Sequence, residues 1–124
     1  MALLTASLRA QLEENGRRQQ SRKGTKDEID FQPVAKLYTP LMRAIWLLTE
    51  IDPKDPDRAF ALCDLGDGSA QLAYVSLTEL DSRFGLMSVR RDESFQADQP
   101  LSAYAAEAGV ETPAGRPRGS PSRD

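Results

Sequence analysis

Histidine is absent from the 124 residues of this chain. A neutral imidazole is the usual base in Ser-His-Asp and Cys-His catalysis and a common ligand in zinc sites. The composition therefore excludes the familiar nucleophilic hydrolases and most zinc proteins. Enzymes that depend on carboxylates or lysines remain compatible with it.

Cysteine and long apolar runs are also scarce. The single cysteine, Cys63, rules out an internal disulfide and fits a reducing compartment. No apolar run approaches the ~20 residues that cross a bilayer. The start Met1–Thr5 has neither the basic beginning nor the long apolar stretch of a signal peptide. We therefore expect a cytoplasmic protein with no membrane partner.

Charge is spread unevenly along the chain. Residues 9–26 hold six basic and two acidic residues, a balance of +4, whereas residues 44–82 hold two basic and eight acidic residues, a balance of −6. The net charge of −3 is too small for an acidic mimic of nucleic acid, and its sign is wrong for a dedicated DNA-binding protein.

The hydrophobic pattern predicts an α+β fold, a small antiparallel sheet of about five strands with short helices at the N-terminus, before the last strand and at the C-terminus. Strands are expected at residues 33–38, 44–51, 58–65, 71–76 and 86–91. In the second strand, strict alternation would place Ile45, Leu47 and Thr49 on one face and Trp46, Leu48 and Glu50 on the other.

Helix signals mark three places. Leu4, Leu8 and Leu12 form a stripe at helical spacing, with Thr5 as the expected N-cap and Gly16 as the expected stop. A capping box, Ser76–Glu79, opens a second helix that should end near Arg83, before Gly85. Residues 100–108 are expected to form a C-terminal helix, with Pro100 in its first turn.

These elements suggest four segments. We expect an N-terminal helix over residues 1–16, a flexible basic linker over 17–31, an α+β core over 32–108 and a disordered tail over 109–124. Trp46 lies in the most apolar strand and should belong to the core. Cys63 has no basic neighbour and is expected to be a buried, inert thiol.

Acidic side chains near strand ends are the first candidate site, and they are Glu50, Asp52, Asp55, Asp57, Asp64 and Asp67. Oxygen ligands of this kind suit Mg²⁺ or Ca²⁺, but the spacing fails the calcium-loop pattern. Asp beside Pro or Gly is also ordinary turn chemistry. We therefore expect no metal and no cofactor, and treat these residues as a candidate partner-binding surface.

Basic side chains in the linker are the second candidate site, and they are Arg17, Arg18, Arg22, Lys23 and Lys26. Such residues can bind phosphates. Interruption by Gln, Ser and Gly makes a solvated linker the competing interpretation. The three tyrosines are not interleaved with basic residues as a stacking platform for single-stranded nucleic acid requires.

Several segments, taken in order, resemble one known family. Pro33–Pro40 resembles the Pro-Val-x-Lys-Leu-Phe-Thr-Pro element of an uncharacterised bacterial family, domain-of-unknown-function family number 2958. Trp46–Pro53 is similar to the most distinctive segment of that family, and Asp64–Gly66, Tyr74–Leu77 and Pro100–Tyr104 follow in order. The resemblance implies a short protein typical of plasmids and conjugative elements, often found beside anti-restriction genes. It assigns no catalytic or binding residue.

These observations favour an accessory protein of a bacterial mobile genetic element that acts as a non-catalytic protein-binding module. An inhibitor of restriction or CRISPR effectors is one form of this hypothesis. The partner would bind an exposed sheet edge or the acidic loops. One alternative is a nucleic-acid-binding protein of plasmid transfer or maintenance, and a second is a carboxylate–metal enzyme such as a nuclease.

Overall fold

The computed structural model describes residues 3–110, so the tail expected over 109–124 lies outside the described residues from residue 111 onward. Within residues 3–110 the strands form one antiparallel sheet in the order β4-β3-β2-β1-β5. Their bounds are β1 Ala35–Tyr38, β2 Ile45–Ile51, β3 Arg58–Asp64, β4 Gln71–Ser76 and β5 Arg90–Arg91. The predicted α+β architecture is confirmed.

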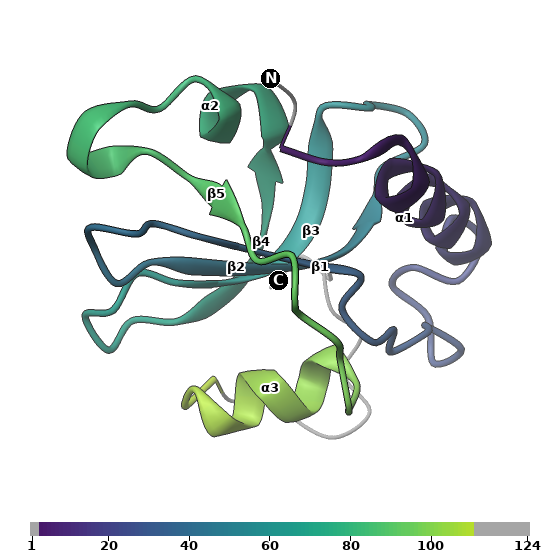
Figure 1. Cartoon of the computed structure of the whole chain (residues 1–124). Helices are drawn as coiled ribbons and strands as arrows, with labels where there is room; N and C mark the ends of the chain where they lie inside the picture. Colours follow the sequence, from purple (N-terminus) through teal and green to yellow (C-terminus); the bar gives the residue numbers. More distant parts are fainter. Residues whose placement is uncertain (1–2, 111–124) are drawn as a thin grey trace.

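Helices cover both faces of this sheet. Figure 1 shows α1 (Ala6–Gln19) and α2 (Leu77–Asp81) on one side of the sheet and α3 (Leu101–Glu107) on the other. A short 3₁₀ helix, Gly85–Met87, lies between α2 and β5. None of the helices in the described residues is long and apolar enough to span a membrane.

The two faces carry separate apolar clusters. On the α1 and α2 face, Leu12, Leu37, Leu48 and Leu80 are among the buried side chains. The α3 face buries a smaller cluster, made of Leu47, Phe60, Leu62, Leu101 and Ala105. A central sheet covered on both sides explains why β2 and β3 are apolar at almost every position.

The N-terminal helix packs on its own sheet. Thr5 caps it as predicted, accepting a hydrogen bond from the Leu8 amide at 3.1 Å. Leu4 and Leu12 are buried against the sheet, and Leu8 packs against the same cluster. The docked leucine stripe supplies the stabilisation that a helix of this length lacks when isolated.

The expected helix end at Gly16 is wrong, because α1 continues through Gly16 to Gln19. A Cβ atom at residue 16 would lie 1.8 Å from the Ile51 carbonyl oxygen. Glycine is therefore present because helix and strand approach closely, and it does not act as a stop signal.

The expected alternation along β2 is also wrong beyond Leu48. The pairing of β2 with β3 shifts between Leu48 and Glu50, which is a β-bulge at Thr49. Glu50 consequently stands opposite Phe60 on the α3 face, while Ile51 joins Leu48 on the other face. The Asn15 side chain of α1 donates to the Thr49 carbonyl at 2.9 Å and so supplies a partner at the bulge.

The region before the last strand differs from its prediction as well. Ser76 caps α2 as expected, accepting from the Glu79 amide at 3.1 Å, but the helix ends at Asp81. The strand expected over 86–91 is reduced to Arg90–Arg91, because Gly85–Met87 forms the 3₁₀ turn.

The segment that follows α1 is tied to the rest of the molecule. The buried Gln19 side chain donates to the Ile29 carbonyl at 2.7 Å and accepts from the Ile29 amide at 2.8 Å. Asp30 accepts from the Ser102 amide at 3.1 Å, at the start of α3. The Phe31 carbonyl accepts from the Leu101 amide at 2.9 Å, so the segment also positions α3.

Candidate functional site

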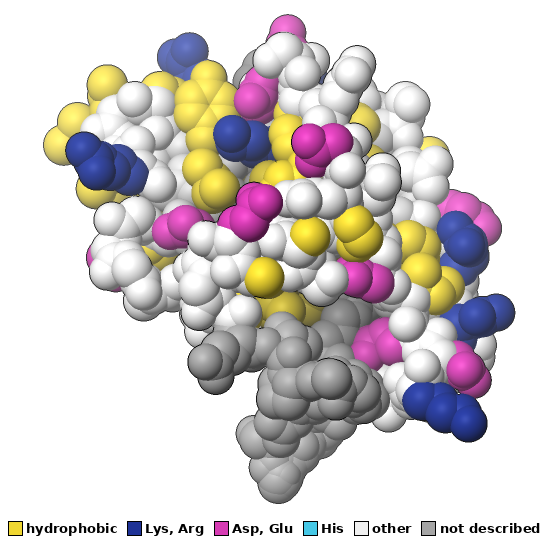
Figure 2. Space-filling view, turned by 90° about the horizontal axis from the view of Figure 1, so that it is seen from below, with side chains coloured by type: hydrophobic (Ala, Val, Ile, Leu, Met, Phe, Trp, Pro, Cys, Tyr) yellow, Lys and Arg dark blue, Asp and Glu magenta, His cyan; other side chains and the backbone are white. Residues whose placement is uncertain are grey.

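The acidic candidates divide between the two ends of the sheet. Glu50 and Asp52 lie at the end of β2, and Asp55 and Asp57 lie in the loop that leads into β3. Asp64 ends β3 and Asp67 follows it, so a whole strand separates these two from the others. In Figure 2 the acidic side chains visible on the α3 side are scattered among other residues and do not gather into one patch.

Most of these carboxylates serve the turns in which they lie. Each accepts a hydrogen bond from the backbone amide two residues further on: Asp52 from Lys54, Asp55 from Asp57, Asp64 from Gly66 and Asp67 from Ser69. This is the local turn chemistry of aspartate. Among residues 3–110 no three acidic or cysteine side chains are arranged to hold a metal ion.

Asp57 reaches further and joins two elements. Its carboxylate accepts from the Ser76 hydroxyl at 2.5 Å and from the Thr78 hydroxyl and amide at 2.7 Å each. These bonds hold the pKa of the Asp57 carboxyl below its usual value, the Ser76 hydroxyl being the largest cause. Asp57 thus fixes the start of α2 to the β2–β3 loop.

Glu50 and Asp52 meet the basic segment in a small hollow of about 120 Å³. Glu50 is buried at 3% exposure and reaches this hollow because the bulge turns it to the α3 face. Lys23 and Tyr74 line the same hollow, and the Lys23 ammonium donates to the Tyr74 hydroxyl at 2.6 Å. The structure therefore brings together members of both predicted sites.

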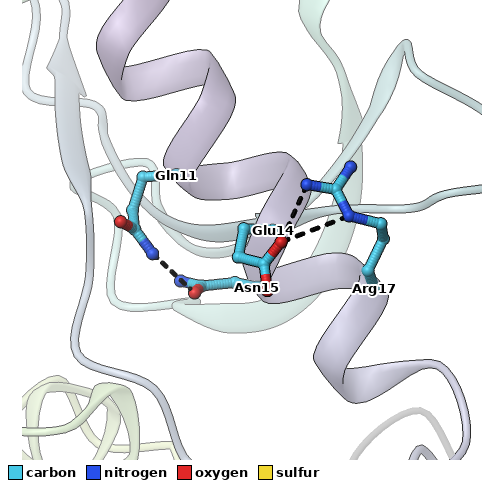
Figure 3. Close-up of polar contacts among 4 residues, drawn as sticks. All are labelled: Gln11, Glu14, Asn15 and Arg17. Carbon is cyan, nitrogen blue, oxygen red and sulfur yellow. Dashed lines mark hydrogen bonds and ion pairs between the residues drawn. The ribbon is translucent and has the colours of Figure 1, made fainter.

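The basic candidates do not present one face for phosphate. Figure 3 shows Arg17 directed at Glu14 on the same helix, with 2.8 Å between its Nη2 and a carboxylate oxygen. The Arg18 guanidinium lies 5.3 Å from the centre of the Phe31 ring. Arg22, Lys23 and Lys26 are all exposed, and of the five candidates Lys23 alone lines the hollow.

Six large apolar side chains are exposed at one end of the sheet, and we call this surface the apolar end. They are between 46% and 85% exposed and comprise Leu41, Met42, Leu65, Phe84, Leu86 and Met87. Three loops carry them, β1–β2, β3–β4 and α2–β5, and Figure 1 shows these loops projecting together on the left.

Contacts within the described residues join the first two of these loops and lead the third back to β1. Gly66 has a φ of +81°, and a Cβ there would lie 2.5 Å from the Arg43 Cβ, so the first two loops touch. The third loop leads into Arg90, which pairs with Tyr38 at the end of β1.

An open hollow of about 330 Å³ adjoins the apolar end. Tyr38, Met42 and Ile45 form its apolar lining. Lys36 and Asp92 also line it, with their charged groups 3.9 Å apart. The hollow and the apolar end share Met42.

Sequence reasoning missed the apolar end because loops carry no periodicity. A usable signal was present, since Leu41-Met42 and Phe84-Gly85-Leu86-Met87 place large apolar residues in turn segments, where polar residues are usual. By contrast, Trp46 is buried at 3% exposure as predicted, with the Arg83 guanidinium 5.3 Å from its ring. Burial raises the pKa of the Cys63 thiol to about 11, in keeping with an inert cysteine.

A family model described as a protein of unknown function, DUF2958, matches residues 3–112. The chain belongs to this family. The DUF2958 match covers every helix and strand described above, including the segment that links α1 to α3. No curated protein and no solved structure matches the chain.

Proposed function

We propose that this DUF2958 protein is a non-catalytic protein-binding module whose partner covers the apolar end. The observation that carries the proposal is the exposure of six large apolar side chains on three loops at one end of the sheet (Figure 1). Contiguous exposed apolar surface on a folded domain typically marks an interaction site. The adjoining hollow offers space for side chains of the partner.

Charge at this end defines the partner further. Arg43 and Arg90 are exposed, and neither forms an ion pair within the described residues. Asp64 and Asp67 lie in or beside the β3–β4 turn at the same end and would repel the phosphates of nucleic acid or of an anionic membrane. The partner we propose is therefore a protein surface with apolar side chains at its centre and carboxylates at its rim.

The biological setting is the wider part of the proposal. The resemblance that the sequence carries supports an accessory protein of a bacterial mobile genetic element, with inhibition of a restriction or CRISPR effector as one role. The acidic loops are the competing surface for such a partner. The basic residues of the segment 17–26 are the competing surface for nucleic acid.

The test begins with a tagged chain purified from a bacterial host that carries the parent element. Half of the eluate is treated with nuclease. Leu41→Ser combined with Phe84→Ser should weaken binding of the purified partner by at least about tenfold, because these side chains are 67% and 85% exposed and belong to the proposed contact. Thermal unfolding should be unchanged, since neither side chain is buried.

A matched variant, Asp52→Asn with Asp55→Asn, alters the acidic loop instead. The proposal is confirmed if the apolar variant loses the partner and the acidic variant keeps it. It is contradicted if the partner is lost only from the acidic variant, or if nuclease removes everything that co-purifies.

A further inference from the structure

Strand β4 lies at an edge of the sheet and is paired on one side only. Its register with β3 runs without interruption from Arg58–Ser76 to Cys63–Gln71. Among residues 3–110 no strand lies on its other side. Half of the backbone groups of a regular edge strand point outward and are available to another chain.

This edge lacks the features that normally prevent pairing. Gln71–Ser76 contains no charged residue, no proline and no glycine, and it has no bulge. The opposite edge is different, because β5 has only two residues and both are arginines. The sheet is therefore protected at β5 and open at β4.

Two cations lie against Tyr74, a residue of this edge strand. The Lys23 ammonium lies 4.7 Å from the centre of the Tyr74 ring, and the Arg58 guanidinium lies 4.5 Å from it. Tyr74 is on the α3 face of β4, in the middle of the strand. A strand added to β4 would bring its own side chains about 5 Å from Tyr74 on that face. Carboxylates at those positions would meet both cations.

The same charges argue against two other occupants. A second copy paired through β4 would bring its Lys23 and Arg58 towards those of the first, and like charges across a strand pair are destabilising. Residues 111–124 of this chain include three arginines and three prolines, and proline cannot donate to a strand ladder.

We infer that the β4 edge captures an extended acidic segment of a partner protein by strand addition, with its carboxylates facing Lys23 and Arg58. Main-chain hydrogen bonds supply affinity in this mode, and alternate side chains supply specificity. The β4 edge is separate from the apolar end, so partner binding at one surface can be disproved without affecting the other. One partner can occupy both surfaces.

The test uses the full chain and a fluorescein-labelled peptide of alternating glutamate and valine. We expect saturable binding by fluorescence anisotropy, weakened by salt, and slower hydrogen exchange at residues 71–76 in the complex. Lys23→Glu combined with Arg58→Glu should reduce affinity by about tenfold or more. Arg22→Glu combined with Lys26→Glu makes the same charge change at exposed sites away from Tyr74 and should leave affinity nearly unchanged.

Loss of folding in the first variant would be visible by circular dichroism, and Lys23→Gln with Arg58→Gln then provides the milder test. The inference is overturned if a lysine–valine peptide binds equally well, or if the peptide slows exchange at residues 41–42 and 84–87 instead. A dimer that depends on β4, seen by sedimentation velocity, would overturn it in favour of a second copy.

Discussion

Gly16 shows how one residue sets the approach of a helix to a sheet. Replacing an exposed glycine inside a helix by alanine usually raises the free energy of unfolding of the protein, by up to about 1 kcal/mol. Here the new Cβ would lie 1.8 Å from the Ile51 carbonyl oxygen. This oxygen belongs to the backbone, so no change of side-chain rotamer can relieve the clash. We expect Gly16→Ala to lower the free energy of unfolding by about 1–3 kcal/mol.

Urea denaturation measures this change, with Ala10→Gly on the exposed side of the same helix as the reference. That reference should cost about 0.5–1 kcal/mol through helix propensity alone. A gain of stability in Gly16→Ala would show that α1 does not approach β2 so closely.

At this scale the sequence predicted local chemistry well and tertiary contacts poorly. Thr5 and Ser76 were predicted as caps because their hydrogen bonds reach only three residues along the chain. Gly16 was misread because the atom that requires glycine belongs to Ile51, which is distant in sequence. Asn15 gave no signal for the same reason, since its partner is the Thr49 carbonyl.

One amide side chain helps to hold the segment between α1 and β1 in place. Gln19 is 1% exposed and makes two hydrogen bonds to the Ile29 backbone. Gln19→Ala leaves the partly buried N–H and carbonyl of Ile29 without these partners, and we expect the free energy of unfolding to fall by about 1 kcal/mol. Amide exchange at Ile29 should accelerate with it.

Gln20→Ala is the matched control, because Gln20 is exposed and adjacent. Its effect on unfolding should stay within about 0.5 kcal/mol. Equal effects of the two substitutions would mean that the Gln19 side chain does not hold this segment.

Among the elements, the long apolar strands were predictable and the irregular ones were not. β2, β3 and β4 lie within a residue of their predicted bounds. Burial makes β2 and β3 apolar at most positions, and turn residues delimit the half-buried β4. The bulge at Thr49 reverses the side-chain alternation, and the identity of Thr49 does not predict a bulge. Leu86 and Met87 of the 3₁₀ turn were likewise taken for the start of a strand, because a short apolar run fits both.

For the whole molecule, three aspartates with lowered pKa values determine how the free energy of unfolding changes at acid pH. A hydroxyl bond to the carboxylate is the largest cause in each case: Asp57 from Ser76, Asp67 from Ser69 and Asp92 from Ser94. A carboxyl whose pKa is lower in the folded state stabilises the fold above its unfolded pKa of about 3.9. That contribution is lost as the pH falls through the folded pKa.

We expect the free energy of unfolding to be level near neutral pH and to decrease below about pH 4. Asp57→Asn should be less stable than the natural chain at neutral pH, with the difference closing in acid. Asp81→Asn, at an exposed aspartate without a hydrogen bond or ion pair in the described residues, should follow the natural chain throughout. A difference in stability between Asp57→Asn and the natural chain that stays constant from neutral to acid pH would contradict the lowered pKa of Asp57.

The buried thiol of Cys63 gives the molecule a built-in kinetic reporter. With a pKa of about 11, very little of the thiol is ionised at pH 7, and the side chain is buried in the cluster on the α1 and α2 face. An alkylating reagent should therefore react mainly when the end of β3 opens. Because the chain has no second cysteine, the rate of alkylation reports how often the β3–β4 pairing opens near Cys63, without any added label.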